Sequence, residues 1–258
     1  DDVAVYIGAW EVKCPNTLCG RYTVLSGDWR LVWNERRKAY MKLKATDGKV
    51  TVEVVEGNAE GLPNPNVSNK RSFAECLLCR TRISLIDPRT GRVYGDKNEI
   101  KSRAVKQRLE FYPKHALGDW NQKLEEYLEG RIGLDELRNA LARPRLLVKV
   151  KIMDKDLMFE SCNEEDNEKL WKALEKLRQI WGDPDIPIEL VPSYESRSIW
   201  VYPYGFDKWF KLFNPRQLLT LVKLVKLIRE AGKRVEEEKL RQGWNREEAF
   251  RYAETVIT

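Results

Sequence analysis

Four of the five cysteines in this 258-residue chain lie in two close pairs. Four residues separate Cys14 from Cys19, and two residues separate Cys76 from Cys79. Each pair can form a turn that presents two thiolates to the same tetrahedral ion. Four sulfur ligands complete such a shell and leave no position for water, so we expect a structural zinc ion rather than a catalytic one.

Two other interpretations of these cysteines are disulfides and unrelated buried residues. The first residues of the chain lack the basic-then-apolar layout of a secretory signal, which favours metal over disulfides. The Cys76–Cys79 pair alone could be redox-active, but no βαβ pattern of a thioredoxin-like fold surrounds it. Cys162 stands apart from both pairs, and we interpret it as an ordinary half-buried residue.

Other chemistry-bearing residues do not converge on a catalytic set. His115 is the only histidine, and no nucleophile signature accompanies it, so we interpret it as a surface or capping residue in a loop over residues 112–118. The acidic run at residues 164–166 precedes a helical pattern, where first-turn carboxylates oppose the helix dipole. We therefore expect no catalytic residue in this chain.

The charge of the chain permits nucleic-acid binding without requiring it. Lys and Arg number 46 against 40 Asp and Glu, giving a net charge of +6. Basic residues gather around the cysteine pairs, whereas residues 154–175 are acidic. The candidate contacts to DNA in this basic region are Arg36, Arg37, Lys38, Arg80 and Arg82.

Aromatic residues are frequent in the same region and could stack on unpaired bases. Aromatic side chains also favour strands, and a role in the core is the favoured interpretation. The residues concerned are Trp10, Tyr22, Trp29, Trp33 and Tyr40.

The sequence pattern predicts an α+β protein, with a zinc-ribbon-containing antiparallel β region followed by a mainly helical region. Residues 5–57 are typical of strands, and Asp47-Gly48 predicts a tight turn between strands 39–45 and 49–55. A second hairpin is predicted around residues 87–91, and a β pair over 146–160. Helical periodicity begins near residue 119 and returns over residues 165–181, 215–230 and from 246 onward.

We expect three domains: a zinc-ribbon β domain with inserted hairpins (1–112), an α+β middle region (113–192) and a helical segment (193–258). The chain begins without Met and ends within a helical pattern, so we expect it to be part of a longer protein. Its longest apolar run, residues 218–228, is interrupted by two lysines, which predicts no membrane partner and a cytoplasmic location.

Two segments together resemble the adenine-specific DNA methylases that contain a zinc ribbon. The first is Cys14-Pro-Asn-Thr-Leu-Cys-Gly20 with the later Cys76–Cys79 pair, and the second is Tyr204-Gly-Phe-Asp-Lys-Trp209 followed by Leu212-Phe-Asn-Pro-Arg-Gln-Leu-Leu219. The resemblance implies a parent enzyme that transfers a methyl group from S-adenosylmethionine to adenine. It covers only the middle of such an enzyme, because the cofactor-binding and catalytic motifs are absent here. Only the cysteines, Arg216 and Gln217 are carried over as site residues.

The resulting expectation is a zinc-stabilised, DNA-contacting segment of an S-adenosylmethionine-dependent adenine-specific DNA methyltransferase, not catalytic by itself. Its expected partners are duplex DNA and the missing methylase core domains. The alternative is a structural or interaction module that docks other domains of the parent protein without touching DNA. A stand-alone enzyme of another class is the least favoured interpretation.

Overall fold

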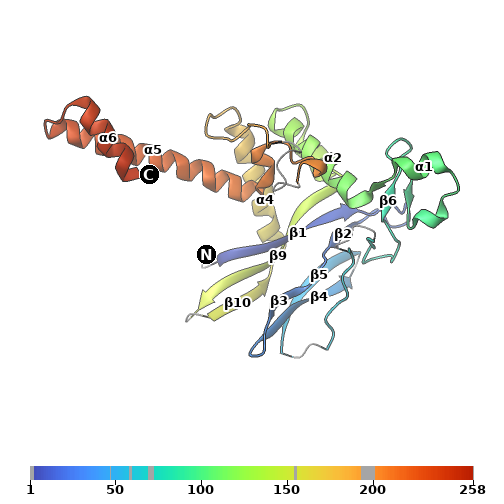
Figure 1. The fold of residues 1–258 in the computed structure, drawn as a ribbon. Helices are drawn as coiled ribbons and strands as arrows, with labels where there is room; N and C mark the ends of the chain where they lie inside the picture. The colour runs from blue at the N-terminus through green and yellow to red at the C-terminus, as the bar shows by residue number, and fades with distance from the viewer. Residues whose placement is uncertain are drawn as a thin grey trace. The chain divides into compact units, whose positions relative to one another are not determined.

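The computed structural model describes residues 3–46, 48–57, 60–68, 73–153, 156–192 and 201–257, and it confirms the predicted α+β class (Figure 1). The chain divides into two compact units. The first combines Asp1–Lys169 with Pro192–Asp207, and the second combines Leu170–Val191 with Lys208–Thr258. The three-domain division drawn from the sequence stays a prediction.

The first unit is built on a four-stranded antiparallel sheet in the order β10-β9-β1-β2 (Figure 1). Its long inner strands are β1 (Val3–Lys13) and β9 (Ala142–Met153). Its shorter outer strands are β2 (Tyr22–Leu25) and β10 (Asp156–Ser161), so the predicted β pair over 146–160 is confirmed. Cys14 directly follows β1, which places the first cysteine at one end of this sheet.

A second antiparallel sheet contains β3 (Arg30–Trp33), β4 (Lys38–Thr46) and β5 (Lys49–Glu56). The predicted hairpin of β4 and β5 is confirmed, and Gly48 has the positive φ of 72° that its turn needs. Asp47, the other predicted turn residue, lies outside the described residues. A hydrophobic core joins strands of both sheets through Val24, Trp29, Met41, Leu147 and Val148.

The third sheet is small and follows the second cysteine pair. It consists of β6 (Leu85–Ile86), β7 (Val93–Tyr94) and β8 (Glu110–Phe111) in the order β7-β6-β8, which confirms the hairpin predicted around residues 87–91. Between β7 and β8 the chain forms a short 3-10 helix, Lys97–Glu99, and helix α1 (Arg103–Arg108), which the sequence pattern did not predict.

Helix α2 (Tyr112–Leu128) packs against β1 and β9 and buries Trp120, Leu124 and Leu128. It is followed by the short helix α3 (Leu134–Arg138). The helix was expected to begin near residue 119, but Pro113 in its first turn starts it seven residues earlier, since proline is compatible with that position. The interpretation of residues 112–118 as a loop is therefore wrong, and His115 lies in the first turns of α2.

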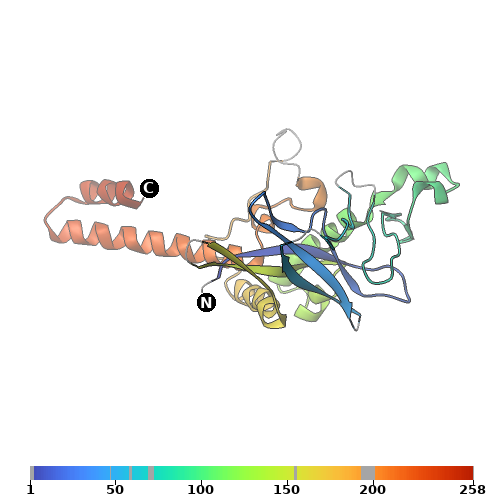
Figure 2. The same cartoon turned by 90° about the horizontal axis from the view of Figure 1, so that it is seen from below.

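Helix α4 (Glu164–Gln179) begins in the first unit, and its later residues belong to the second. The second unit otherwise contains a 3-10 turn at Trp209–Leu212, helix α5 (Pro215–Arg241) and helix α6 (Arg246–Ile257). Helices α5 and α6 lie side by side (Figure 2). None of the helices in the described part of the chain is long and apolar enough to cross a membrane.

Helix α5 continues eleven residues beyond its predicted end at residue 230. Gly232 lies within it without ending it, because a single glycine only weakens a helix. Charge pairs at helical spacing follow, including Arg234 with Glu230 and Arg241 with Glu237. These polar positions carry no apolar periodicity, which explains why the sequence pattern placed the end too early.

Candidate metal centre

The first cysteine turn connects β1 to β2. The backbone N–H of Cys14 donates to the carbonyl of Arg21 over 2.8 Å, and the carbonyl of Asn16 accepts from the N–H groups of Cys19 and Gly20. Gly20 has a φ of 57°, which glycine adopts without steric cost. We call residues 14–21 the first knuckle.

The second cysteine turn repeats this arrangement with a shorter loop. The N–H of Cys76 donates to the carbonyl of Thr81 over 3.0 Å, and the N–H of Arg80 donates to the carbonyl of Cys76 over 2.9 Å. Arg80 follows the second cysteine as Gly20 does in the first knuckle, and its φ is 60°. Among the described residues it is the only non-glycine with positive φ. We call residues 76–81 the second knuckle.

The two knuckles bring all four sulfurs together, with every pair within 4.8 Å. Cys14 Sγ lies 3.7 Å from Cys79 Sγ, and Cys19 Sγ lies 4.0 Å from Cys76 Sγ. A metal–sulfur distance of about 2.3 Å predicts about 3.8 Å between sulfurs at the corners of a tetrahedron. A disulfide needs about 2.05 Å. The cluster can therefore hold one metal ion, and its sulfurs are too far apart for disulfides.

Contacts within the cluster shift the pKa values of Cys14 and Cys76 in opposite directions. The contact with the Cys14 thiol lowers the pKa of Cys76, although burial opposes this effect. The N–H groups of Cys79 and Leu78 also point at the Cys76 sulfur and stabilise its thiolate. The same contact with Cys76, together with burial, raises the pKa of Cys14. Backbone N–H donors thus already face a sulfur that would carry charge as a metal ligand.

Side chains outside the cysteines fix the knuckles against each other and the fold. The amide of Asn16 donates to the hydroxyl of Thr81 over 3.0 Å, and that hydroxyl lies 3.2 Å from Cys79 Sγ. Thr23 of β2 accepts from the N–H of Leu77 over 2.9 Å. The hydroxyl of Tyr112 at the start of α2 donates to the carbonyl of Lys13 over 2.6 Å. These contacts join residues far apart in the sequence and were not predicted; Asn16, lying inside the first knuckle, was the only signal of them.

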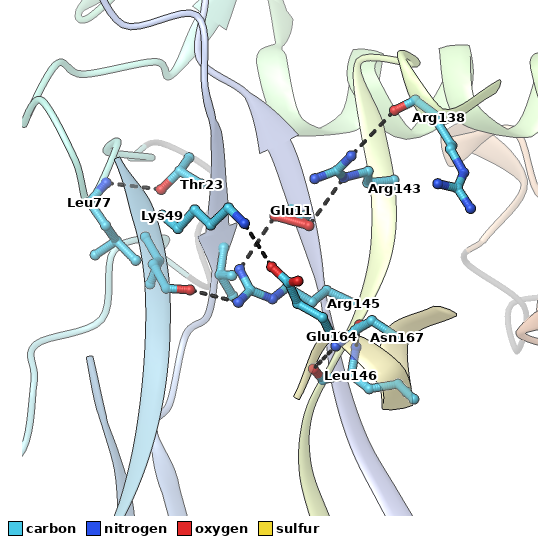
Figure 3. A network of polar contacts seen from close by, with 12 residues as sticks. Glu11, Thr23, Lys49, Leu77, Arg138, Arg143, Arg145, Leu146, Glu164 and Asn167 are labelled. Atoms are coloured by element: carbon cyan, nitrogen blue, oxygen red, sulfur yellow. Dashed lines mark hydrogen bonds and ion pairs between the residues drawn. The ribbon is translucent and has the colours of Figure 1, made fainter. Parts of the chain in front are cut away.

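A buried carboxylate holds the strand that leads to the first knuckle. Glu11 of β1 has a side chain only 7% exposed, and it meets Arg143 at 3.1 Å and Arg145 at 3.6 Å, both from β9 (Figure 3). Arg145 also donates to the carbonyl of Val50 on β5 over 2.6 Å. This network ties the four-stranded sheet to β5 of the second sheet.

The structure separates the predicted DNA-contacting residues into different places. Gly48, in the turn between β4 and β5, lies against the guanidinium of Arg21 in the first knuckle. Residues 36–38 lie at the opposite end of β4, about 30 Å away at the rise of a strand. Arg37 pairs there with Glu56 and Asp156. Arg80 and Arg82 instead belong to, or directly follow, the second knuckle.

The two residues carried over from the methylase resemblance lie at the start of α5. Asn214 accepts from the N–H groups of Arg216 and Gln217, both over 3.0 Å. The side chain of Gln217 accepts from the N–H of Asn214 over 3.0 Å, which completes a capping box. Gln217 therefore has a clear structural role, and its contact with DNA stays a prediction.

The residues that follow the second knuckle carry most of the excess charge. The segment 80–108 contains nine Lys or Arg and three Asp or Glu, so its net charge of +6 equals that of the whole chain. Arg108 pairs with the buried Asp87 over 2.6 Å. The other eight basic residues are exposed, and only Arg80 has an acidic partner among the described residues. We call these eight the basic segment: Arg80, Arg82, Arg89, Arg92, Lys97, Lys101, Arg103 and Lys106.

The aromatic residues near the cysteines mostly serve the core. Trp29 and Tyr40 are each 1% exposed, as the favoured interpretation predicted. Trp33 is 38% exposed, but Lys38 and Arg30 lie over its ring.

Comparisons with known protein families, with curated proteins and with solved structures find no match to this chain.

Proposed function

We propose that the four cysteines hold one structural zinc ion, and that the basic segment beside this centre contacts the backbone of duplex DNA. Zinc is favoured because four thiolates in a tetrahedral arrangement are its usual structural shell. The observation that carries the DNA proposal is the set of eight exposed basic side chains in residues 80–108, which have one acidic partner among the described residues. Such unpaired charges can replace the counterions of DNA phosphates.

The resemblance to adenine-specific DNA methylases supports a larger setting for this module. In that setting the parent enzyme methylates adenine from S-adenosylmethionine, and this chain grips the duplex while a base is extruded. The metal has no open position, so its role is to fix the two knuckles from which the basic segment starts. This chain by itself binds and does not catalyse.

Duplex DNA binding by the zinc-loaded chain, measured over a series of salt concentrations, tests the proposal. The variant K101Q/R103Q/K106Q removes three charges from the basic segment, and K42Q/K172Q/K233Q, which changes three exposed lysines outside that segment, is its matched control with the same net charge. Each phosphate contact contributes about 0.9 to the slope of log K against log salt, so the test variant should lower the slope by up to about 3. The control should leave the slope close to that of the parent chain.

Two outcomes would contradict the proposal. Equal losses in the test and control variants would mean that DNA responds only to the net charge. Binding that is absent at low salt would exclude DNA contact by this chain. Zinc is tested separately by elemental analysis, which should find one zinc ion per chain.

A second candidate function is docking to other domains of the parent protein, and α5 supports it. Leu224 is 49% exposed and Leu227 is 53% exposed, and together with Leu221 and Ile228 they give this helix an exposed apolar surface. Under this alternative the L224Q/L227Q variant loses association with the methylase core, whereas K223Q/K226Q keeps it. DNA binding would then be absent in all of these proteins.

A further inference from the structure

A hollow of about 410 Å³ lies beside the metal centre, between the two knuckles and the β6–β7 hairpin. Both knuckles and the hairpin turn contribute to it, so its shape depends on the metal-binding fold. Its volume falls in the range of about 300–1,000 Å³ that is usual for small-ligand sites. It is lined by Pro15, Asn16, Thr81, Arg82, Gly91, Arg92 and Val93.

The lining of this hollow is positively charged. It includes two arginines and no Asp or Glu, and neither arginine forms an ion pair with a described residue. Arg82 extends over the ring of Phe73 at 5.4 Å, and Arg92 over the ring of Tyr94 at 5.2 Å. An aromatic ring under each guanidinium reduces the number of positions it samples, and it leaves the N–H donors free for an anion.

Folding brings these two arginines to the same hollow although nine residues separate them in the sequence. Arg82 directly follows the second knuckle, whereas Arg92 closes the turn of the hairpin, where its carbonyl accepts from the N–H of Asp87 over 2.9 Å. The carboxylate of Asp87 forms its ion pair with Arg108, at 2.6 and 2.7 Å, and not with either of the hollow-lining arginines. The hairpin turn is thus fixed by an acid that does not neutralise the hollow.

We propose that this hollow binds one phosphate group, with Arg82 and Arg92 as its ligands. Arginine forks match the geometry of phosphate oxygens, and two of them from different elements can hold one group from two sides. The identity of that group as a backbone phosphate of DNA rests on the proposed function above. The hollow would then be the position at which the basic segment fixes the register of the duplex.

A competing role for the two arginines is to balance the charge of the metal centre. Four thiolates around Zn²⁺ carry a net charge of −2, which nearby cations stabilise. In that case substituting Arg82 and Arg92 would weaken metal binding, and phosphate would not bind in the hollow. The same variants therefore distinguish the two roles, since one role predicts weaker metal binding and the other predicts the loss of phosphate binding.

The first experiment is an NMR titration of the zinc-loaded chain with inorganic phosphate, at constant ionic strength set by chloride. We expect saturable shifts of the Gly91 and Arg92 amides. The shifts should be lost in R82Q/R92Q and retained at weaker affinity in R82K/R92K, which keeps the charges but not the guanidinium forks. The matched control R89Q/K97Q removes two exposed charges outside the hollow and should titrate like the parent chain.

The second experiment repeats the DNA salt series with the same variants. R82Q/R92Q should lower the slope of log K against log salt by about 1 for the one phosphate lost. Phosphate shifts without any DNA binding would retain the hollow as a phosphate site and reject the DNA function. Two results would refute the assignment of the hollow as a phosphate site without refuting the proposed DNA function. One is DNA binding that R82Q/R92Q leaves unchanged, and the other is a loss of zinc from this variant in place of the loss of phosphate shifts.

Discussion

The side-chain amide of Asn16 donates to the hydroxyl of Thr81 over 3.0 Å, across 65 residues of sequence, and so joins the two knuckles outside the metal shell. The hydroxyl of Thr81 also lies 3.2 Å from Cys79 Sγ. Partners of this kind orient metal ligands, and their loss typically weakens metal binding by about 10-fold to 100-fold. Removing this contact therefore tests directly how the metal centre is organised.

Replacing Thr81 tests this contact. T81V keeps the shape of the side chain but removes the hydroxyl, so zinc affinity should fall by roughly 10-fold. T81S keeps the hydroxyl and serves as the control, with an affinity close to that of the parent chain. Competition with a chromophoric chelator measures both constants. Equal affinities in the two variants would show that the hydroxyl does not support the cluster.

Arg80 occupies a left-handed position that costs a residue with a side chain about 1–2 kcal/mol. R80G removes this cost, but glycine also gives the unfolded chain more freedom, so the expected net gain is about 0.5–1 kcal/mol. Urea unfolding of the zinc-loaded chain measures it. R89G removes an exposed arginine at a position without positive φ, and it should destabilise instead.

Removing one metal ligand should uncouple the knuckles. C76S leaves three sulfurs for the ion, and we expect its zinc content to fall from one per chain to nearly zero after dialysis against a mild chelator. The Cobalt(II) absorption of a tetrahedral thiolate site should disappear with it. C162S changes the cysteine outside the cluster and should retain one zinc per chain. Equal zinc contents in the two variants would place the metal elsewhere.

The Asp87–Arg108 pair predicts a defined dependence of stability on pH. Hydrogen bonds from Arg108 hold the pKa of the Asp87 carboxyl well below its usual value of about 3.9. A carboxyl with a lowered pKa in the folded state contributes stability that is present above its unfolded pKa. That contribution is lost as the pH falls through the folded pKa.

The comparison that isolates this contribution is the parent chain against D87N. The difference between their urea midpoints should be constant down to about pH 4 and should shrink below it. Loss of metal in acid affects both proteins, so it cancels in the difference. A gap that stays constant to the lowest measurable pH would show that the carboxylate charge does not stabilise the hairpin.

Substituting Glu11 should destabilise the fold more than substitution at most other polar positions. E11Q leaves Arg143 and Arg145 without the charge that they share, and both are partly exposed, so we expect a loss of about 1–2 kcal/mol. A double-mutant cycle with R143Q should show coupling of about 1 kcal/mol between the two sites. Additive effects in the cycle would mean that the pair contributes nothing beyond packing.

Local patterns predicted much of this structure. The spacing of the cysteines predicted the cluster, Asn214-Pro215 predicted the start of α5, and Asp47-Gly48 predicted the hairpin of β4 and β5. In each case the signal lies within a few residues of the feature. Such signals are independent of the rest of the fold.

Those local patterns could not predict pairings between residues that lie far apart in the sequence. Nothing local indicated that β9 would pair with β1, more than 130 residues earlier in the sequence. The chemistry of the basic residues depends on the same distant partners. Arg37 is paired with Glu56 and Asp156, whereas Arg92 lines the hollow without an acid beside it, although both are arginines in basic stretches of the sequence.

The order of the ligands along the chain bears on when the metal can enter. Cys19 and Cys76 are 57 residues apart, and the whole sheet of β3, β4 and β5 lies between them. A newly made chain can offer an ion only two neighbouring thiolates at a time, which makes a weak and incomplete site. The full affinity exists only after that sheet has closed the loop, and long loops close slowly. We therefore predict that a metal ion would be captured late in folding, by a chain whose strands have already brought the cysteines together.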